Sequence, residues 1–356
     1  MRSVVSFSAP GVVEIVEEDE PALRASEVRV RTLYSGISAG TELTSYRGSS
    51  PHLSKHWDLD RRLFVEGAEE LSYPVLNLGY EEVGEIVEVG ADADRALLGK
   101  RVWGTWGHRT TAELDAEFAA ARLLDVDADP RIGMFSHIGA VALNAVLDAD
   151  VHVGETVAVF GLGVPGQLVA QLARLNGARV IAVEGIAARR ELATALGADL
   201  VLDVAAGSAA ETIRDLTDDR GADVAIEITG NVRALHEAIR AVAYNSRVVV
   251  AGFSVGDAVG LRLGEEFHHN RVQLVSSQIS GVGAGIAHRW DRYRLWSTAI
   301  ALAESGRLDV LSLISHQVPY RDAADAYRML DERPGEALQV VLDFTEQDSS
   351  EQRGRA

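Results

Sequence analysis

The sequence predicts an α/β protein in which a strand-rich N-terminal part precedes a doubly wound parallel sheet. Three observations support this fold class: short alternating segments before about residue 137, apolar strands alternating with helical stretches after it, and a glycine-rich turn where the first of those strands meets its helix. A chain of 356 residues is long enough for two domains. Its apolar (47%) and charged (24%) fractions are those of a globular protein, which excludes a disordered or fibrous chain.

The N-terminal part consists of short strands and turns. Residues 28–33 (VRVRTL) alternate as a half-buried strand does, and residues 80–90 form a second strand-like run that ends at Gly90. Between them, residues 47–73 are polar and rich in charge and histidine. We predict an inserted loop or a short helical excursion there, a kind of segment that often serves as a lid.

Strands and helices alternate from about residue 139 onward. Apolar strands separated by helices indicate a parallel sheet with right-handed crossovers. The predicted strands are 156–160, 179–184, 199–204, 222–229, 246–252 and 271–277, and the predicted helices are 166–177 and 188–198. After about residue 285 we expect a helix, a final strand at 337–344 and a disordered polar tail at 345–356.

Charge and composition exclude several classes of partner. The net charge of −19 argues against nucleic acid, because basic patches supply most of the affinity for a phosphate backbone. The absence of cysteine excludes disulfides, thiolate metal sites and a cysteine nucleophile. The N-terminus lacks the cationic start of a signal peptide, and no apolar run approaches the roughly 20 residues that cross a bilayer. We therefore expect no membrane partner and a cytoplasmic location.

The strongest single signal is the turn between the first parallel strand and its helix, where the pattern G-x-G-x-x-G appears in the strand–turn–helix context that gives it meaning. The first glycine permits a sharp turn, the second lets a pyrophosphate approach the backbone, and the third lets the helix pack on the strand. The N–H groups at the start of the helix then face the phosphates. The predicted dinucleotide-binding residues of this turn are Gly161, Gly163, Val164, Pro165 and Gly166.

Glu184 ends the second strand, eighteen residues after Gly166. A carboxylate at this position accepts hydrogen bonds from the adenosine ribose and repels a 2′-phosphate, which favours NAD(H) over NADP(H). Arg189 and Arg190 lie nearby in the sequence and weaken this preference, although we expect them to face solvent on the next helix.

Together these motifs resemble those of the medium-chain dehydrogenase/reductase superfamily, the alcohol dehydrogenase-like proteins. The resemblance covers nearly the whole chain and lies in residues 78–90, 97–104, 154–166, 196–203, 246–253 and 314–330. It implies a GroES-like β domain that the C-terminal segment completes, with a Rossmann NAD(P)-binding domain between the two parts. We place the first domain at 1–137 and 286–356 and the second at 138–285.

The residues expected to hold a catalytic zinc in this superfamily are missing. At the matching positions the sequence has Ser38 (SGISAGTEL), Tyr80 (LGYEE) and Ser136 (MFSHIG), none of which is a good zinc ligand. The lobe that carries a structural zinc is absent too. His137 could replace one ligand, but one histidine and the carboxylate of Glu81 make a poor site. The pattern is most similar to a zinc-free branch that includes the bacteriochlorophyllide hydroxyethyl dehydrogenase, and we predict no metal.

Without a metal, a hydrogen-bond donor or proton carrier must manage the charge on the reacting oxygen. Tyr80 is the first candidate, with a pocket-wall aromatic as the equal alternative. Ser38, Thr41 and Ser136 are weaker donors that could bind the same oxygen. Glu81 could orient a group or receive a proton if burial raises its pKa.

Substrate contacts are predicted for Trp106, His108 and Trp57, with core or structural roles as the alternatives for the first two. Trp57 belongs to the polar insertion, whose residues form either a cationic, aromatic lid over an anionic or sugar-like substrate or a solvated loop. The other charged or aromatic members of that insertion are His52, Lys55, His56, Arg61 and Arg62. We expect His268 and His269 at an interface or on the surface, and His316 in a structural role.

The resemblance also places residues near the nicotinamide half of the cofactor and suggests an assembly. The cofactor-binding residues that it implies there are Thr229, Gly230, Ala251, Phe253 and Gln278. The sixth Rossmann strand is the usual dimer edge in such proteins, so a homodimer is expected.

The leading functional hypothesis is a zinc-independent, NAD(H)-dependent oxidoreductase that interconverts a secondary alcohol and a ketone. The polar insertion favours a polyol, a sugar-like compound or a specialised metabolite as the small-molecule substrate. One alternative is NAD(P)H-dependent reduction of an activated C=C bond, as in zinc-free enoyl and quinone reductases. The other is a dinucleotide-binding protein without catalysis, which the loss of every zinc ligand makes admissible.

Overall fold

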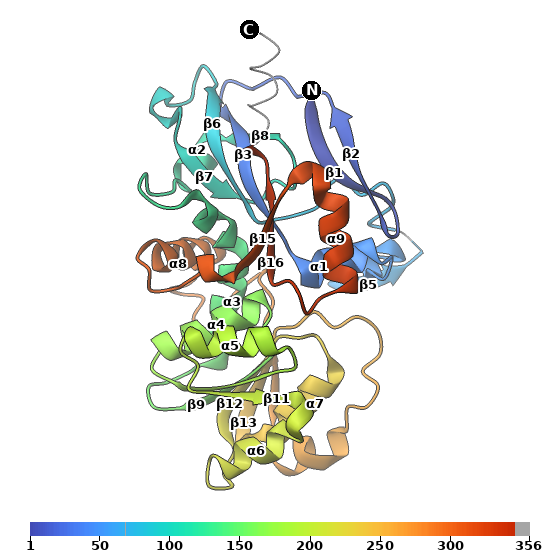
Figure 1. Ribbon diagram of the computed structural model, residues 1–356, viewed down its shortest axis with the longest axis vertical. Coiled ribbons are helices and arrows are strands. Elements are labelled where there is room, and N and C mark those ends of the chain that lie inside the picture. The colour runs from blue at the N-terminus through green and yellow to red at the C-terminus, as the bar shows by residue number, and fades with distance from the viewer. Residues whose placement is uncertain (68, 346–356) are drawn as a thin grey trace. The chain divides into compact units, whose positions relative to one another are not determined.

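The computed structural model describes residues 1–67 and 69–345 (Figure 1). The described residues form two compact units, one made of residues 1–67, 69–137 and 314–345, and the other of residues 138–313. The tail for which we expect disorder lies, apart from Thr345, outside the described residues.

The second domain boundary differs from our expectation. Residues 286–313, assigned above to the first domain, belong to the second unit. Helix α8 (Arg292–Glu304) packs there: its Ala299 lies so close to Gly139 that a Cβ on the glycine would approach the Cβ of Ala299 to 2.9 Å. The amide of Gln171 also exchanges two backbone hydrogen bonds with Asp309, at 3.0 and 2.8 Å.

The second unit is built on a six-stranded sheet in the order β11-β10-β9-β12-β13-β14, with every neighbouring pair parallel. Its strands are β9 (Thr156–Phe160), β10 (Arg179–Glu184), β11 (Leu200–Asp203), β12 (Ala222–Glu227), β13 (Val242–Val250) and β14 (Gln273–Ser276). All five residues of β9 are buried, as expected for a central parallel strand covered on both faces. The strand order reverses between β9 and β12, which is where such sheets bind ligands.

Helices cover both faces of this sheet (Figure 1). On one face, α6 and α7 pack on the strands through alanine and isoleucine side chains, including Ile213 and Ile239. The helices of the unit are α3 (Ser136–Ala149, which begins in the first unit), α4 (Val164–Leu175), α5 (Ala187–Ala195), α6 (Ala209–Asp215), α7 (Val232–Ala241) and α8. Shorter turns are η4 (Val204–Ala206), the π-type η5 (Leu263–Phe267) and η6 (Leu311–Leu313).

The first unit contains a mixed sheet in the order β15-β16-β3-β6-β7, with β8 also paired to β3. The C-terminal strand β16 lies antiparallel to β3, with Val340 opposite Ile37, so the end of the chain completes a sheet begun at its start. The strands are β1 (Arg2–Ala9), β2 (Val12–Glu18), β3 (Glu27–Ile37), β6 (Glu82–Val89), β7 (Arg101–Gly104), β8 (Thr111–Asp115), β15 (Ile314–Pro319) and β16 (Gln339–Asp343). The helices are α1 (Ala39–Tyr46), α2 (Ala116–Ala120) and α9 (Ala323–Glu332), with turns η1 (Pro51–Leu53), η2 (Arg95–Leu97), η3 (Pro130–Phe135) and η7 (Tyr320–Asp322).

The polar insertion contains a small β-hairpin, which the loop or helical expectation did not include. Strands β4 (Lys55–Asp58) and β5 (Leu63–Glu66) pair antiparallel, with Trp57 opposite Phe64. The two rings meet edge to face at 5.1 Å, and each remains more than a third exposed. A cross-strand aromatic pair of this kind stabilises a short hairpin, which explains why a polar segment forms strands here.

One segment of the described residues, Pro130–Ala149, is long and apolar enough to cross a membrane by length and composition. The apolar window is 78% buried within the protein, as in the central helix of a folded domain.

Candidate functional site

The glycine turn has the geometry that dinucleotide binding requires. Gly161 has φ +98°, a conformation that favours glycine. A Cβ on Gly166 would lie 1.9 Å from the carbonyl oxygen of Gly161, so only glycine fits at that position. Gly163 caps α4, with Val164 and Pro165 in its first turn. The free N–H groups of this first turn are the part of the unit best suited to hold a pyrophosphate.

Glu184 is tied to this turn by its carboxylate. Oε2 accepts the N–H of Leu162 at 2.8 Å, and Oε1 accepts those of Gly185 at 2.7 Å and Ile186 at 3.0 Å. Each oxygen has further lone-pair capacity for a ribose hydroxyl. The residue therefore both shapes the turn and presents an anionic acceptor beside it.

The two arginines after Glu184 do not face solvent freely, contrary to our expectation. Arg189 Nη1 lies 4.0 Å from Glu184 Oε2, and burial lowers the pKa of its guanidinium while Glu184 opposes that change. Arg190 pairs with Asp203 at 2.7 Å and donates to the carbonyl oxygens of Glu184 and Gly185. Both therefore stabilise the loop that carries Glu184.

A residue that the sequence analysis missed, Glu227, organises the turns that carry Thr229, Gly230 and Ala251. Its Oε1 accepts the N–H groups of Thr229 (2.6 Å) and Gly230 (3.1 Å) and the hydroxyl of Thr229. Its backbone carbonyl accepts the N–H of Ala251 at 2.8 Å. The side chain is fully buried and Oε2 has no hydrogen-bond partner, and burial raises the pKa of the carboxyl. Glu227 thus joins the turns after β12 and β13.

The remaining predicted contacts lie at the same carboxyl edge of the sheet. Gly230 has φ +70°, and a Cβ there would meet the carbonyl oxygen of Phe253 at 2.5 Å, so the two turns touch. The side chain of Phe253 is half exposed. Gln278 follows β14, and its Oε1 accepts the N–H of Ser280 at 2.6 Å. The predicted residues therefore follow successive strands β9, β10, β12, β13 and β14 of one sheet.

In the first unit, three of the predicted catalytic residues form a cluster of hydroxyl groups. The hydroxyl of Tyr80 makes a short hydrogen bond with Ser38 Oγ and donates to Thr41 Oγ1 at 3.1 Å. The cluster lies just beyond the last residues of the β3–β6 ladder, where Ser35 faces Glu82. The ring of His137 packs against that of Tyr80 at 4.5 Å between centroids. Burial, reinforced by the carboxylate of Glu81, raises the pKa of Tyr80, so the phenol is protonated at neutral pH.

Ser136 and Glu81 flank this cluster without bonding to it. Ser136 begins α3, beside His137, and is 1% exposed. Glu81 is also 1% exposed, and its Oε2 has no hydrogen-bond partner; a Cβ on Gly36 would lie 2.5 Å from this atom. Burial raises the pKa of Glu81 well above its ordinary value, and the nearby carboxylates of Glu42 and Glu82 raise it further. With its pKa raised in this way, the Glu81 carboxyl can hold a proton in the folded protein.

A catalytic zinc does not fit these residues. The donors at the three positions are the hydroxyls of Ser38, Tyr80 and Ser136, and zinc prefers thiolate, imidazole and carboxylate ligands. The phenol of Tyr80 is kept protonated and already bonded to two other hydroxyls. The carboxyl of Glu81 is directed toward Gly36 and is buried.

Two of the predicted substrate contacts, His108 and Trp106, are buried, which fits the core or structural alternatives. The side chain of His108 is fully buried, with Nε2 bonded to Glu42 at 2.9 Å and Nδ1 to Ser35 at 2.6 Å. Burial alone would lower its pKa, but the Glu42 carboxylate more than compensates and raises it. Trp106 is 9% exposed, lies in a hydrophobic cluster and donates Nε1–H to Thr32. The third predicted contact, Trp57, lies on the exposed hairpin described above.

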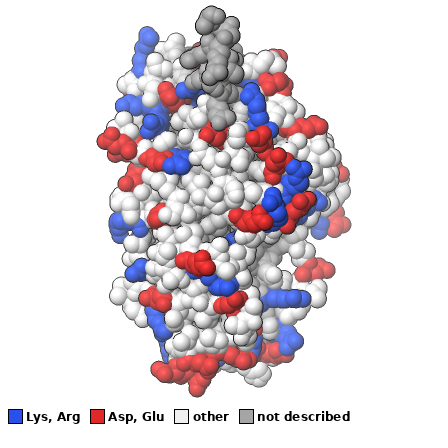
Figure 2. All heavy atoms as spheres, viewed as in Figure 1, with Lys and Arg blue, Asp and Glu red and all other residues white. Residues whose placement is uncertain are grey.

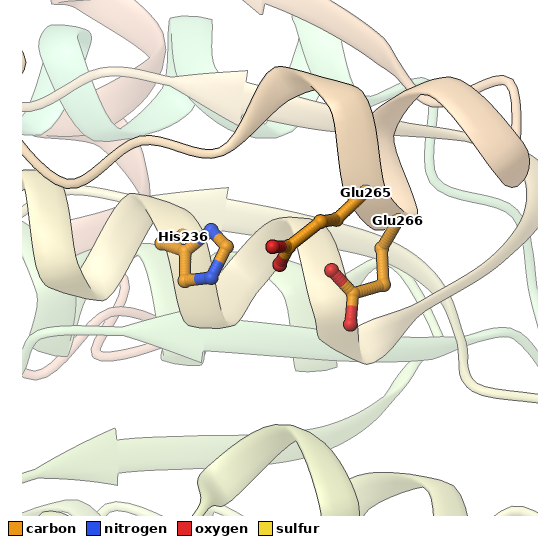
Figure 3. Close-up of side chains that lie close together, drawn as sticks. All are labelled: His236, Glu265 and Glu266. Atoms are coloured by element: carbon orange, nitrogen blue, oxygen red, sulfur yellow. The ribbon is translucent and has the colours of Figure 1, made fainter.

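Among the described residues, one group of histidine and acidic side chains is close enough to hold a metal ion, and it lies in the second unit (Figure 3). It comprises His236 on α7 and Glu265 and Glu266 on η5, with candidate ligand atoms within 4.8 Å of one another. Both carboxylates already face guanidinium groups, Glu265 that of Arg262 at 3.5 Å and Glu266 that of Arg240 at 3.3 Å. These ion pairs account for the cluster without a metal.

The fold and the turn define an oxidoreductase of the dinucleotide-binding type, and the comparisons give the family. A family model described as "Zinc-binding dehydrogenase" matches residues 163–304. D-guloside 3-dehydrogenase of Escherichia coli (strain K12) is 30% identical over 351 residues, covering 97% of this chain and all of that protein. The chain belongs to the medium-chain dehydrogenase/reductase superfamily, the alcohol dehydrogenase-like proteins, and is an enzyme of that type.

Solved structures agree on the fold. The 2R,3R-butanediol dehydrogenase of Bacillus subtilis superposes with a TM-score of 0.77 at 20% identity, covering 96% of this chain and 99% of that one. A zinc-binding dehydrogenase of Sinorhizobium meliloti, bound to NADP, gives a TM-score of 0.76 at 21% identity over the same shares. The predicted fold class, a GroES-like domain plus a Rossmann domain, is confirmed.

Proposed function

We propose that this enzyme is a zinc-independent, NAD(H)-dependent dehydrogenase that interconverts a secondary alcohol and a ketone on a sugar or sugar-like substrate. The observation that carries the proposal is the cluster of Tyr80, Ser38 and Thr41, in which Ser38 and Tyr80 match positions where the superfamily's zinc enzymes have metal ligands. The similarity to a D-guloside 3-dehydrogenase over the whole chain supports a sugar hydroxyl as the reacting group.

The residues of the second unit are suited to hold a nicotinamide dinucleotide. The turn at Gly161, Gly163 and Gly166 would hold the pyrophosphate, Glu184 the adenosine ribose, and the turns joined by Glu227 the nicotinamide half. When bound, the nicotinamide exchanges a hydride with the substrate carbon. The preference for NAD(H) rests on the free acceptor capacity of the Glu184 carboxylate.

Tyr80 donates a hydrogen bond to the reacting oxygen and takes part in the transfer of its proton. Its raised pKa keeps the phenol protonated, so its single O–H can turn from Thr41 to a ketone oxygen and stabilise the charge that develops there. In the oxidative direction the carbon loses a hydride and the hydroxyl loses a proton. The hydrogen-bonded hydroxyls of Tyr80, Ser38 and Thr41 relay that proton by successive exchange, and water at the exposed Thr41 accepts it.

The experiment that tests this function is a spectrophotometric assay of the purified enzyme with both cofactors. With NAD, the panel contains methyl hexosides, cyclitols and simple secondary alcohols; with NADH, it contains the matching ketones and a set of enones. NADH formation from a sugar hydroxyl is the expected result. Consumption of NADH by enones alone would establish the C=C reductase instead, and NADH binding without any turnover would indicate a protein without catalysis.

A homodimer formed through β14 completes the proposal. This strand is the last in the sheet order, and three of its four residues, including Leu274, are exposed. An exposed edge strand is a ready surface for pairing with a second copy.

On the face seen in Figure 2, basic and acidic side chains are interspersed and basic residues form no continuous region, in keeping with a small-molecule enzyme. We place the enzyme in the cytoplasm.

A further inference from the structure

An unassigned cavity of about 500 Å³, broadly open to solvent, lies in the second unit, beyond the carboxyl end of β14. One side of the cavity is the loop at 280–282, which follows Gln278, and the other side is the start of α8 with Trp290, Arg292, Tyr293 and Trp296. The carboxyl edge of a parallel sheet is where this class of fold binds its ligands. The cavity therefore follows, on the same edge, the turns assigned above to the nicotinamide half of the cofactor.

The aromatic side chains of the cavity are held in place by stacked guanidinium groups. Arg294 lies over the Trp290 ring at 4.5 Å from its centroid, and Arg292 lies over the Trp296 ring at 5.1 Å. The carboxylate of Asp291 caps α8 by accepting the N–H of Arg294 at 2.7 Å. Because cation–π stacking and the cap both restrict rotation, the wall is organised before any ligand arrives.

The loop on the other side is anchored at both ends to α3. Ser277 Oγ accepts a hydrogen bond from Asn144 Nδ2 at 3.2 Å, and Asn144 is 1% exposed. At the far end, Asp148 accepts the backbone N–H of Gly283. The two walls are therefore fixed to the body of the unit, which suits a preformed pocket.

Arg292 provides unused hydrogen-bond donors at this cavity. Its side chain is exposed, and no acidic residue within 1–67 or 69–345 forms an ion pair with it, whereas Arg240 alone faces three carboxylates. A planar guanidinium carries five N–H donors in a fixed fork, which matches two neighbouring oxygen atoms. The indole rings of Trp290 and Trp296 offer apolar faces for C–H groups, and the guanidinium of Arg292 beside them offers donors for hydroxyl oxygens.

We infer that this cavity binds the sugar ring of the substrate, with Arg292 donating to a pair of vicinal hydroxyls and the aromatic wall covering the apolar face of the ring. The inference rests on the proposed function, because it names the part of the chain that selects a sugar over a simple alcohol. A pyranose has one face of C–H groups and a rim of hydroxyls, so an aromatic surface and a planar donor together recognise it.

The test compares Arg292→Ala with a matched control, Arg321→Ala, which removes a similar stack, 5.0 Å over Tyr320, in the other unit. For the methyl hexoside that gives the highest turnover, Arg292→Ala should raise KM about tenfold or more, the effect of losing a hydrogen bond from a charged group. The dissociation constant of NADH, and kcat/KM for 2,3-butanediol, should stay within about twofold of the wild type. Arg321→Ala should change none of these values.

Direct binding separates this inference from the proposed function. Isothermal titration of methyl hexosides into the enzyme–NADH complex should show binding that Arg292→Ala weakens to the same degree, even if no hexoside is oxidised. Unchanged hexoside binding in Arg292→Ala would overturn the inference. An equal loss of activity on 2,3-butanediol would also overturn it, as would a change of oligomeric state in the variant, which would assign the cavity to contact with a second copy.

Discussion

The glycine turn and the hydroxyl cluster differ in what holds each together. In the turn, the essential contact joins the backbones of Gly161 and Gly166, five residues apart. The two backbones can approach this closely because Gly166 has no side chain. In the cluster, Ser38 and Tyr80 are 42 residues apart, and His137 arrives from a third segment. A binding site made of backbone can be read from local spacing, while a site made of side chains depends on strand register.

Changing the third glycine of the turn should have the largest effect on the enzyme. Gly166→Ala would place a Cβ 1.9 Å from the carbonyl oxygen of Gly161, so the strand–helix junction must shift. We expect a loss of unfolding free energy of about 3 kcal/mol, at the upper end of overpacking effects, together with loss of NADH binding. Thermal unfolding and NADH fluorescence measure both.

The control for that variant is Gly264→Ala, in the same unit, where a Cβ would meet nothing within 4 Å. If Gly166→Ala bound NADH as the control does, the turn would not be the pyrophosphate site.

Removing one hydroxyl should break the cluster while leaving the turn intact. Tyr80→Phe keeps the ring packed on His137 but deletes the group that bonds Ser38 and Thr41. Turnover should fall by roughly 10²-fold or more, the usual contribution of a positioned proton donor, with NADH binding unchanged. Steady-state rates with wild-type substrate provide the measurement, and Tyr244→Phe, at an exposed tyrosine of the other unit, is the control. Wild-type turnover in Tyr80→Phe would reduce the residue to a packing role.

The next effect concerns cofactor choice, through Glu184. Glu184→Gln keeps the side-chain shape and one acceptor for the Leu162 N–H but removes the negative charge. The dissociation constant of NADH should rise about tenfold, as for loss of a hydrogen bond to a charged group, while NADPH should bind as well as before or better. Fluorescence titration with both cofactors is the measurement. Equal weakening of the two would contradict the ribose assignment.

The smallest expected effect is on stability and comes from Glu81. Because its pKa is raised in the folded state, the folded protein holds a proton that the unfolded chain releases, so stability falls as the pH rises above the ordinary carboxyl pKa. Glu81→Gln removes this dependence and should raise the unfolding midpoint at pH 8 by about 1–2 °C, the shift that roughly 1 kcal/mol gives in a chain of 356 residues.

At pH 4 the difference between Glu81→Gln and the wild type should shrink, because the unfolded carboxyl is then also largely protonated. Glu14→Gln, at an exposed position on β2, is the control. A midpoint that Glu81→Gln lowers at pH 8 would show that the folded protein needs the charged carboxylate.

The difference between the glycine turn and the hydroxyl cluster also shows which features the sequence could predict. Glycine spacing and strand hydrophobicity indicated the turn and the parallel sheet because both depend on neighbouring residues. Glu227 was missed because an acid at the end of a buried strand gives no signal until the turns after β12 and β13 meet around it. The role of His108 stayed open between a substrate contact and a structural position because its partners Glu42 and Ser35 lie 66 and 73 residues away. Such long-range pairs are set by sheet register, which one sequence does not reveal.

The most direct test of the account is a rate measurement on metal-stripped enzyme. The purified protein would be dialysed against a chelator, its zinc content measured by mass spectrometry, and NADH formation from a methyl hexoside followed before and after treatment. We predict far less than one zinc per chain and an unchanged rate, which Tyr80→Phe lowers by roughly 10²-fold or more. About one tightly held zinc per chain, with activity lost on its removal and restored on its return, would contradict it.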